Sequence, residues 1–440
     1  MTRRLVLALL LWAGLALAPA PAAAQEASPE LRARAEQVVA LLRGEAAAAE
    51  MFAPSFLAAV PEAQLATVTR QLVAQHGEAR ALAGILPRSA TAAAIQVDME
   101  RAVLSMNLSI EAAPPHRIEG LLVTGAAARA ATFDELVAEL RALPGQVSFA
   151  VARLGDGAPE PIAALEPDRP LAIGSAFKLL ILAELDRQIA AGDRRWSDVA
   201  TLDRRSLPSG QLQGWPDGAP LTLHTLAAMM ISVSDNTATD VLLHLVGREQ
   251  VEATMARIGV AAAARNRPFP GTLEMFALKT APEAEQEAWI AADEADRRRL
   301  LAERYDATAP DGIDPARFAG APLRIEALEW FASADDMVRI LDWLRRRGGD
   351  EARAILAISP GGAPALREEF AYVGYKGGSE PGVINLSWLV RAESGDWYAV
   401  TGSWNDPAAP LDEARFAALM RRALQLLRRQ ASPTGEGQPQ

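Results

Sequence analysis

The chain has 440 residues, of which 50% are hydrophobic and 22% charged, as in ordinary globular proteins, and it is long enough for more than one domain. Its net charge of -11 argues against a non-specific nucleic-acid binder, which needs a basic surface. The absence of cysteine excludes disulfides, cysteine-ligated metals and thiol catalysis. The histidines lack the close spacing of metal-binding motifs, so we expect no metal, with a carboxylate-only site as the open alternative. The histidines are His76, His116, His224 and His244. We also expect no cofactor.

The N-terminus has the pattern of a signal peptide. Arg3 and Arg4 precede the apolar run Leu5–Leu17, and a stretch of small residues ends at Ala22-Ala23-Ala24. We therefore predict a signal peptide over residues 1–24 and release into the periplasm or the medium. A retained N-terminal anchor is the alternative. No later stretch predicts a stable membrane span.

Residues 25–127 are predicted to form a small α+β domain. Apolar residues recur at helical spacing from Pro29 to about Gln75, and alternating segments follow from Leu86 to Thr124. This order of helices and then a sheet resembles a cystatin-like or NTF2-like fold. The alanine-rich stretch Gly125–Ala131 predicts the boundary with the next domain.

Residues 128–430 are predicted to form an α+β domain with one antiparallel sheet. A helix at Phe133–Leu143 and a strand at Val147–Leu154 begin it, and a long helical middle follows. The sheet and the final helix resume near the C-terminus, at Val373–Lys376, Ile384–Arg391, Trp397–Trp404 and Leu411–Arg429. Strands at both ends of the domain predict a sheet closed by its two termini, flanked by helices and an all-helical subdomain. Residues 431–440 predict a disordered tail.

Lysine is unusually rare in this chain. Only three of the 44 basic residues are lysine, namely Lys178, Lys279 and Lys376. Lysine differs from arginine in having a compact amine whose pKa can fall far enough to accept a proton. The bias therefore predicts that lysine is retained where arginine cannot replace it.

The first lysine lies in the motif Gly174-Ser175-Ala176-Phe177-Lys178, where the apolar helical run Leu179–Ile189 begins. Residues three apart share a helix face, so the Ser175 hydroxyl and the Lys178 amine are expected within hydrogen-bond reach. Free N–H groups in the first turn would favour developing negative charge. This predicts an activated nucleophile; the alternative is an N-cap serine beside a solvated lysine.

Two further polar motifs follow. Ser234-Asp235-Asn236 lies between helical segments at Leu223–Ile231 and Thr237–Val246, and its alternative reading is a helix connection capped by Ser234 or Asp235. Tyr375-Lys376-Gly377-Gly378-Ser379 is predicted at the end of a strand, where glycines allow a ligand to approach. Its alternative is a hairpin turn with an exposed lysine.

In this order the three motifs resemble those of the serine β-lactamase and penicillin-binding superfamily, Ser-x-x-Lys, Ser-Asp-Asn and Lys-Thr-Gly. The segments Pro170–Lys178 and Leu221–Ala238 resemble class A β-lactamases most. The resemblance spans about Phe133–Arg429 and leaves out the N-terminal domain. It implies a serine β-lactamase-like fold and hydrolysis of cyclic amides.

The resemblance also implies roles for individual residues. Ser175 would open a β-lactam ring and form an acyl-enzyme, while Lys178 and Ser234 would move protons. The backbone N–H groups of Ser175 and Ser379 would form the oxyanion hole. Gly377 replaces the family's threonine, so one substrate-facing hydroxyl is missing. Substrate binding is assigned to Asn236, Lys376, Gly378 and Ser379.

The residue that would activate the deacylating water is less clearly matched. The segment Arg265–Phe276 lacks the Glu-x-x-Leu-Asn pattern of class A enzymes, and Glu274 is its only carboxylate. Glu274 is the candidate base. The alternative places it in the first turn of a helix running towards Lys279 and capped by Thr272. Lys279 is expected to be an exposed residue paired with a nearby carboxylate.

Residues 281–322 form an insertion, in which Ala281–Arg304 predicts a surface helix that either flanks the site as a lid or is a solvated decoration.

The leading functional prediction is an exported β-lactam hydrolase acting on small β-lactams or cell-wall peptides. Alternatives are a D,D-peptidase or esterase, an acylated sensor, and a binding module in which Ser175 is vestigial. The sequence predicts no nucleic-acid partner.

Overall fold

The computed structural model describes residues 27–128, 132–207, 209–305, 313–318, 320–361 and 365–431. The predicted signal peptide and nearly all of the predicted tail lie outside these residues. Within them, no helix has the length and apolar character needed to cross a membrane.

The N-terminal unit consists of helices followed by an antiparallel sheet of order β1-β2-β3-β4, as the sequence predicts. Leu31 and Val38 of α1 pack against Ile95 and Leu104 of the sheet in a separate hydrophobic core. The first strand was not predicted, because its alanines and glycine give a weak alternating pattern. The elements are α1 (Pro29–Leu42), α2 (Ala48–Met51), α3 (Pro54–Ala59), α4 (Glu62–His76), β1 (Ala79–Pro87), β2 (Ala92–Met99), β3 (Ala102–Ile110) and β4 (Ile118–Ala128).

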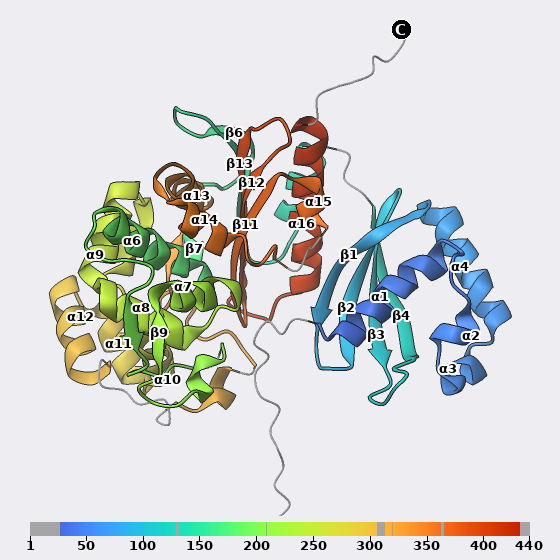
Figure 1. Ribbon diagram of the computed structural model, residues 1–440, viewed down its shortest axis with the longest axis horizontal. Coiled ribbons are helices and arrows are strands. Elements are labelled where there is room, and N and C mark those ends of the chain that lie inside the picture. Colours follow the sequence, from blue (N-terminus) through green and yellow to red (C-terminus); the bar gives the residue numbers. More distant parts are fainter. Residues whose placement is uncertain are drawn as a thin grey trace, which may run out of the picture.

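The second sheet is antiparallel, with the order β11-β12-β13-β5-β6. Its strands are β5 (Gln146–Leu154), β6 (Glu160–Leu165), β11 (Tyr372–Glu380), β12 (Val383–Arg391) and β13 (Trp397–Asn405). Strand β13 pairs with β5, so the two ends of the domain close one sheet, as predicted (Figure 1). Helices α5 (Phe133–Arg141) and α16 (Glu413–Ala431) cover one face, and α13 (Ala334–Arg347) packs on the other.

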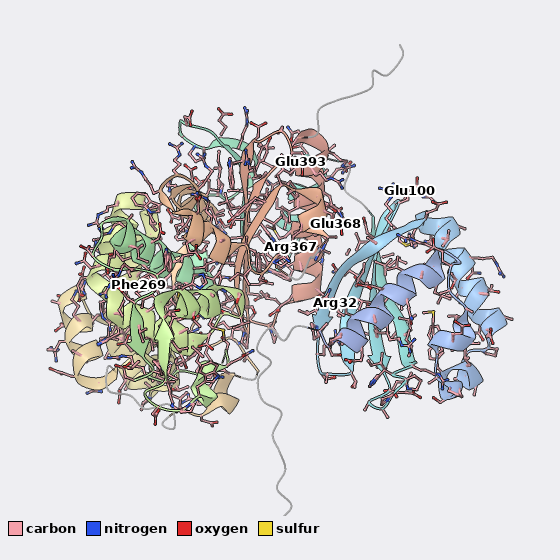
Figure 2. The ribbon with its side chains drawn as sticks, in the orientation of Figure 1. Arg32, Glu100, Phe269, Arg367, Glu368 and Glu393 are labelled. Atoms are coloured by element: carbon pink, nitrogen blue, oxygen red, sulfur yellow. The ribbon has the colours of Figure 1, made fainter. Side chains whose placement is uncertain are left out.

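A helical half lies beside this second face (Figure 1). It comprises α6 (Lys178–Ala190), α7 (Leu223–Ser232), α8 (Asn236–Val246), α9 (Arg248–Ile258), α10 (Thr272–Thr280), α11 (Glu283–Ala291) and α12 (Glu294–Leu300). Figure 2 places the fully buried Phe269 among these helices. The fold class is therefore the predicted one: α+β, with an antiparallel sheet, a helical subdomain and a preceding α+β unit.

Helix α16 lies between the two sheets (Figure 1). Its apolar residues Phe416 and Leu419 pack on the second sheet. On its other side, the side-chain amide of Gln96 in β2 donates to the Ala414 carbonyl at 2.5 Å. The polar residues on one face of the N-terminal sheet are thus partly covered by the C-terminal helix.

Two local predictions were wrong. Strand β11 does not end at Lys376 but continues to Glu380, so the glycines lie within a strand and not in a hairpin turn. The stretch 281–304 is not the single surface helix that the sequence predicts, because it forms α11, α12 and a following π-helical turn at Leu301–Tyr305. Trp289 and Leu301 of this stretch are buried in the main core. The stretch 281–304 is therefore an integral part of the helical half.

Candidate active site

The segment that carries Ser175 is a short turn between a strand and a helix. Strand β7 (Leu171–Ala172) leads into the 3₁₀ turn η1 (Gly174–Phe177), and α6 begins at Lys178. Ser175 therefore precedes the α-helix and does not belong to its first turn. Two residues after Ser175, the Phe177 ring stacks on Trp330 with 3.9 Å between ring centroids. This aromatic pair anchors the end of the turn that carries Ser175.

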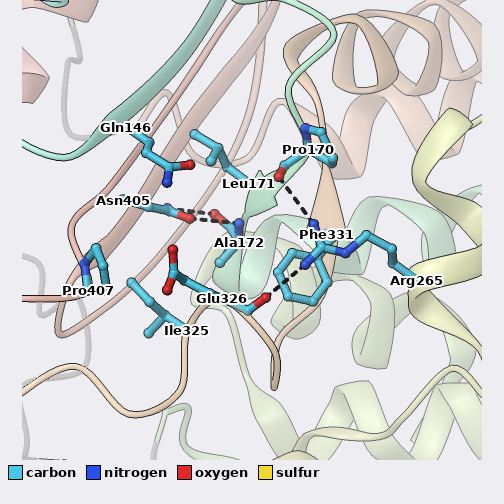
Figure 3. Close-up of a pocket in the computed structure, with 10 residues that line it drawn as sticks. All are labelled: Gln146, Pro170, Leu171, Ala172, Arg265, Ile325, Glu326, Phe331, Asn405 and Pro407. Carbon is cyan, nitrogen blue, oxygen red and sulfur yellow. Dashed lines mark hydrogen bonds between the residues drawn. The ribbon is translucent and has the colours of Figure 1, made fainter. Parts of the chain in front are cut away.

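The strand before Ser175 is held from two sides. Ala172 pairs with Phe331 of β10 (Phe331–Ala332). The Asn405 side chain accepts from the Ala172 N–H at 2.8 Å and donates to its carbonyl at 3.0 Å (Figure 3). A small pocket of about 140 Å³ adjoins these contacts, and Arg265 stacks over the Phe331 ring at its wall (Figure 3). None of the predicted catalytic residues lines this pocket. The hydrogen bonds between Asn405 and Ala172 beside it hold the backbone that leads to Ser175.

Lys178 is completely buried, which excludes the alternative of a solvated lysine. Its Nζ donates to the Ser234 carbonyl at 2.6 Å, to Ser234 Oγ at 3.0 Å and to Asn236 Oδ1 at 2.6 Å. Burial, followed by the charge of Lys376, lowers the pKa of Lys178 well below its ordinary value. The environment thus favours an amine that can take up a proton.

The expected hydrogen bond between Lys178 and the Ser175 hydroxyl is absent from the described residues. All three amine protons of Lys178 go to Ser234 and Asn236 instead. Two of these acceptors, the Ser234 carbonyl and Asn236 Oδ1, cannot donate a proton. If Lys178 is neutral, its lone pair therefore faces a hydroxyl and not these two oxygens.

The second motif places Ser234 in the left-handed region, with φ of 57°, which is uncommon for a residue other than glycine. The fully buried Asp235 side chain fixes this turn. It accepts from the Ala238 N–H at 2.8 Å as the N-cap of α8, and from the N–H groups of Gln211 and Leu212 at 2.6 and 2.9 Å. Asp235 thus supports the strained Ser234 backbone. In this conformation the Ser234 side chain is directed at both Lys178 and Lys376.

Lys376 reaches the same hydroxyl from β11. Its Nζ donates to Ser234 Oγ at 3.0 Å and to the Gly377 carbonyl at 2.6 Å. Burial lowers the pKa of Lys376 to about 7. An ammonium group has three donors, and two of them are used among the described residues. One donor is therefore available for an anionic ligand.

Glycines bring β11 against the serine. A Cβ on Gly378 would lie 2.3 Å from both the Ile173 carbonyl oxygen and the Ser175 nitrogen. A Cβ on Gly174 would lie 3.1 Å from the Ser379 nitrogen. The backbones of Ser175 and Ser379 are thus adjacent, which is the arrangement that an oxyanion hole made of two N–H groups requires.

The structure also accounts for glycine in place of threonine at position 377. A Cβ there would lie 2.1 Å from the hydroxyl oxygen of Tyr375. Tyr375 thus occupies the space in which a side chain at position 377 would start. The missing hydroxyl follows from this packing.

Glu274 does not join the other predicted site residues. It lies in α10, as one of the two sequence readings predicts, but Gly271 and not Thr272 precedes the helix as its N-cap. The Glu274 carboxylate accepts from the Gly271 N–H at 2.6 Å and from Arg248 at 2.7 and 3.1 Å. These contacts engage both carboxylate oxygens, so Glu274 caps α10 and pairs with Arg248.

Sequence reasoning missed two groups near the site. Asp240, one turn after Asn236, accepts from the N–H groups of Thr272 and Leu273 at 2.6 and 3.0 Å and ties α8 to α10. Lys279 is fully buried between the carboxylates of Glu329 and Glu380 and is not the expected surface residue. The rarity of lysine in the sequence was the one signal that Lys279 has a special environment. No cluster of metal-ligating side chains occurs in the described part of the chain.

The sequence model of the β-lactamase enzyme family matches residues 129–357. This match covers more than half of the chain and includes the motifs of Ser175 and Ser234. The chain belongs to the β-lactamase enzyme family. The match ends before Lys376, whose place in the site rests on the third sequence motif and on its contact with Ser234.

Among solved structures, the chain is similar to a β-lactamase from Sphaerobacter thermophilus DSM 20745, with 22% identity, a TM-score of 0.47, and coverage of 68% of this chain and 98% of the other. A β-lactamase from Chitinophaga pinensis DSM 2588 is 18% identical, with a TM-score of 0.46 and coverage of 68% and 98%. A protein called PBP-A is 14% identical, with a TM-score of 0.45 and coverage of 68% and 94%. No curated protein matches the sequence.

Proposed function

We propose that this member of the β-lactamase family is acylated at Ser175 by β-lactams or by related cell-wall peptides. The observation that carries the proposal is that the amines of Lys178 and Lys376 each lie 3.0 Å from Ser234 Oγ. With Lys178 neutral, the Ser234 hydroxyl accepts from Lys376 and donates to Lys178, so its proton can move. Such a group suits protonation of the nitrogen that leaves when an amide opens.

In the proposed reaction, Ser175 Oγ attacks the carbonyl carbon and its proton passes to neutral Lys178. Negative charge on the carbonyl oxygen is stabilised by the N–H groups of Ser175 and Ser379. The C–N bond then breaks, the nitrogen takes the Ser234 proton, and Lys178 returns a proton to Ser234. Asn236 orients Lys178, and Lys376 binds the substrate carboxylate.

Hydrolysis of the acyl-enzyme is the step with the least support. The only carboxylate predicted for water activation, Glu274, is engaged by Arg248 and the Gly271 N–H. This favours slow deacylation, as expected for a penicillin-binding peptidase or an acylated sensor. Rapid turnover, and with it a role in antibiotic resistance as a class A enzyme, would need another base.

We further propose that residues 1–24 are a signal peptide that directs the protein to the periplasm or the medium. The basic and apolar pattern of this segment supports the proposal. The domain boundaries at about residues 127 and 430 are also proposals, supported by the separate hydrophobic core of the N-terminal unit. Intact mass of protein from cell fractions would locate the cleavage site.

Intact mass spectrometry with benzylpenicillin tests the proposed chemistry, with Ser175→Ala as the control. We expect a one-to-one adduct on the wild type, persisting for many minutes, and none on Ser175→Ala. Rapid loss of the adduct with accumulation of ring-opened product would instead establish a β-lactamase with an unrecognised base. No adduct on either protein would refute acylation by penicillins.

A further inference from the structure

The third lysine of the chain lies in a buried ionic cluster that the proposed reaction does not use. Lys279 of α10 has no exposed side-chain surface, and its Nζ lies 2.5 Å from Glu329 Oε1 and also contacts Glu380 Oε1. Only 1% of the Glu329 side chain and 14% of the Glu380 side chain are exposed. Three charged groups are therefore enclosed together, which costs stability unless each is well partnered.

The cluster joins the elements that surround Ser175. Glu380 directly follows Ser379 at the end of β11. Glu329 Oε2 accepts from the Trp330 N–H at 3.1 Å, and the Trp330 ring stacks on Phe177. The Trp330 carbonyl in turn accepts from the Ile173 N–H at 3.0 Å, two residues before Ser175. The Lys279 amine thus links the end of β11 to the segment that holds the nucleophile turn.

Strand β11 needs such a link because it is at the edge of its sheet and pairs only with β12. Its residues 377 and 378 are glycines, which lack side chains to pack the strand in place. The strand end must nevertheless stay close to η1, since an added Cβ on Gly378 would come within 2.3 Å of the Ser175 nitrogen. A tie at residue 380 restrains this end of the strand.

We propose that Lys279, Glu329 and Glu380 act as a clamp that fixes the end of β11 against the nucleophile turn, so that the Ser379 N–H is positioned for the oxyanion. The three are positioning residues, because none of them contacts Ser175, Lys178 or Ser234 in the described structure. The role in catalysis rests on the proposed acylation of Ser175; the conformational role does not.

The charges of the cluster agree with this role. Burial lowers the pKa of Lys279, but the charges of Glu329 and Glu380 outweigh it, so the pKa is raised and the amine stays protonated. Burial and the neighbouring Glu329 raise the pKa of Glu380 well above its ordinary value. The cluster therefore holds one ammonium group, that of Lys279, and two carboxyl groups, those of Glu329 and Glu380, which share one further proton. Arginine would not fit as a substitute, because its larger planar group needs a different geometry.

Variants at Glu380 test the clamp where the cluster is least buried. Glu380→Ala removes the tie, whereas Glu380→Gln keeps an oxygen acceptor for Lys279 and leaves one carboxylate to balance one ammonium. Lys279→Met is the complementary change. The matched control is Glu139→Ala, which removes the 2.9 Å ion pair with the buried Arg422 on the opposite face of the sheet.

Hydrogen exchange of residues 372–380 and the acylation rate constant with benzylpenicillin are measured on each variant. For Glu380→Ala and Lys279→Met we expect faster exchange confined to this segment, and an acylation rate constant lower by about 10- to 100-fold with little change in penicillin affinity. Glu380→Gln should restore most of the rate, and Glu139→Ala should change neither measurement.

The outcomes separate the clamp from the proposed function. Unchanged exchange in β11 for Glu380→Ala would overturn the clamp, and faster exchange with an unchanged acylation rate would overturn its role in catalysis. If Lys279→Met fails to fold, hydrogen exchange and acylation of Glu380→Ala still test the clamp. If the wild type is not acylated, the proposed function fails while hydrogen exchange still decides whether the clamp exists.

Discussion

Lys178 and Lys376 meet at a single hydroxyl, since each Nζ lies 3.0 Å from Ser234 Oγ. The two lysines come from different halves of the domain, α6 and β11, and both are buried. Burial lowers the pKa of both amines, and the charge of Lys376 lowers the pKa of Lys178 further, so the lowered values are a consequence of the fold itself. The serine between them connects the proton acceptor with the anion-binding lysine.

Replacement of Lys178 should separate catalysis from stability. For Lys178→Met we expect the acylation rate constant to fall by at least about 100-fold, because the proton acceptor is lost. The free energy of unfolding should stay the same or rise, since a buried amine is replaced by an apolar side chain of similar length. Intact mass after timed mixing with benzylpenicillin and urea denaturation measure the two effects. An unchanged acylation rate in Lys178→Met or Lys178→Arg would exclude the proton-transfer role.

The charge of Lys376 predicts a pH dependence. Because burial lowers its pKa to about 7, the free protein carries this charge below pH 7 and loses it as the pH rises. We expect the acylation efficiency with benzylpenicillin, relative to that with an uncharged phenyl ester, to fall up to about tenfold per pH unit above this value. The ratio removes effects common to both substrates, such as titration of Lys178. A flat ratio between pH 6 and 9 would show that Lys376 does not bind the carboxylate.

The same shift predicts the sign of a stability change. The pKa of Lys376 is lower in the folded than in the unfolded chain, where it has its ordinary value of 10.5. Burial of the ammonium therefore destabilises the fold fully below pH 7, and the effect disappears between pH 7 and 10.5. Lys376→Met should thus raise the free energy of unfolding more at pH 6 than at pH 10, as urea denaturation at both values would show. An equal change at both values would contradict the shift.

The sequence motifs predicted the central network well, because each motif is local. Ser234 and Asn236 flank the N-cap of α8, so secondary structure alone fixes much of their geometry. The predicted bond between Ser175 and Lys178 is the exception, because Ser175 lies in the 3₁₀ turn before the helix. The closure of β5 and β13 into one sheet also followed from strands at both ends of the domain. Local patterns thus specified the elements and the residues that they present.

The parts that could not be predicted depend on partners that are distant in sequence. Lys279 is buried by Glu329 and Glu380, which lie 50 and 101 positions away. Glu274 is paired with Arg248, 26 positions away. Sequence patterns predict that a charged residue is exposed when its partner is unknown. Lys279 was therefore wrongly expected at the surface, and two readings of Glu274 stayed open. The glycines of β11 were expected to open the strand edge to a ligand or, in the alternative, to form a turn. In the structure, the close approach of η1 requires Gly378.

Glu274 should prove structural. Glu274→Ala removes the helix cap and leaves Arg248 without the carboxylate, so we expect a loss of about 1–3 kcal/mol in the free energy of unfolding. The lifetime of the penicillin adduct should not change. Arg248→Gln is the matched variant and should lower stability in the same way. A much longer adduct lifetime in Glu274→Ala, together with unchanged stability, would instead identify Glu274 as the deacylating base.

Gly378 provides the most direct test of the contact between β11 and the nucleophile turn. In Gly378→Ala the new Cβ would lie 2.3 Å from the Ser175 nitrogen, so the strand must move away and carry the Ser379 N–H with it. Removal of one oxyanion-hole donor lowers rates by about 100- to 1,000-fold in serine hydrolases, and we expect a loss of this order in the acylation rate constant. Gly157→Ala is the control, because no atom lies within 4 Å of the Cβ position there. Normal acylation of Gly378→Ala would mean that Ser379 does not stabilise the oxyanion.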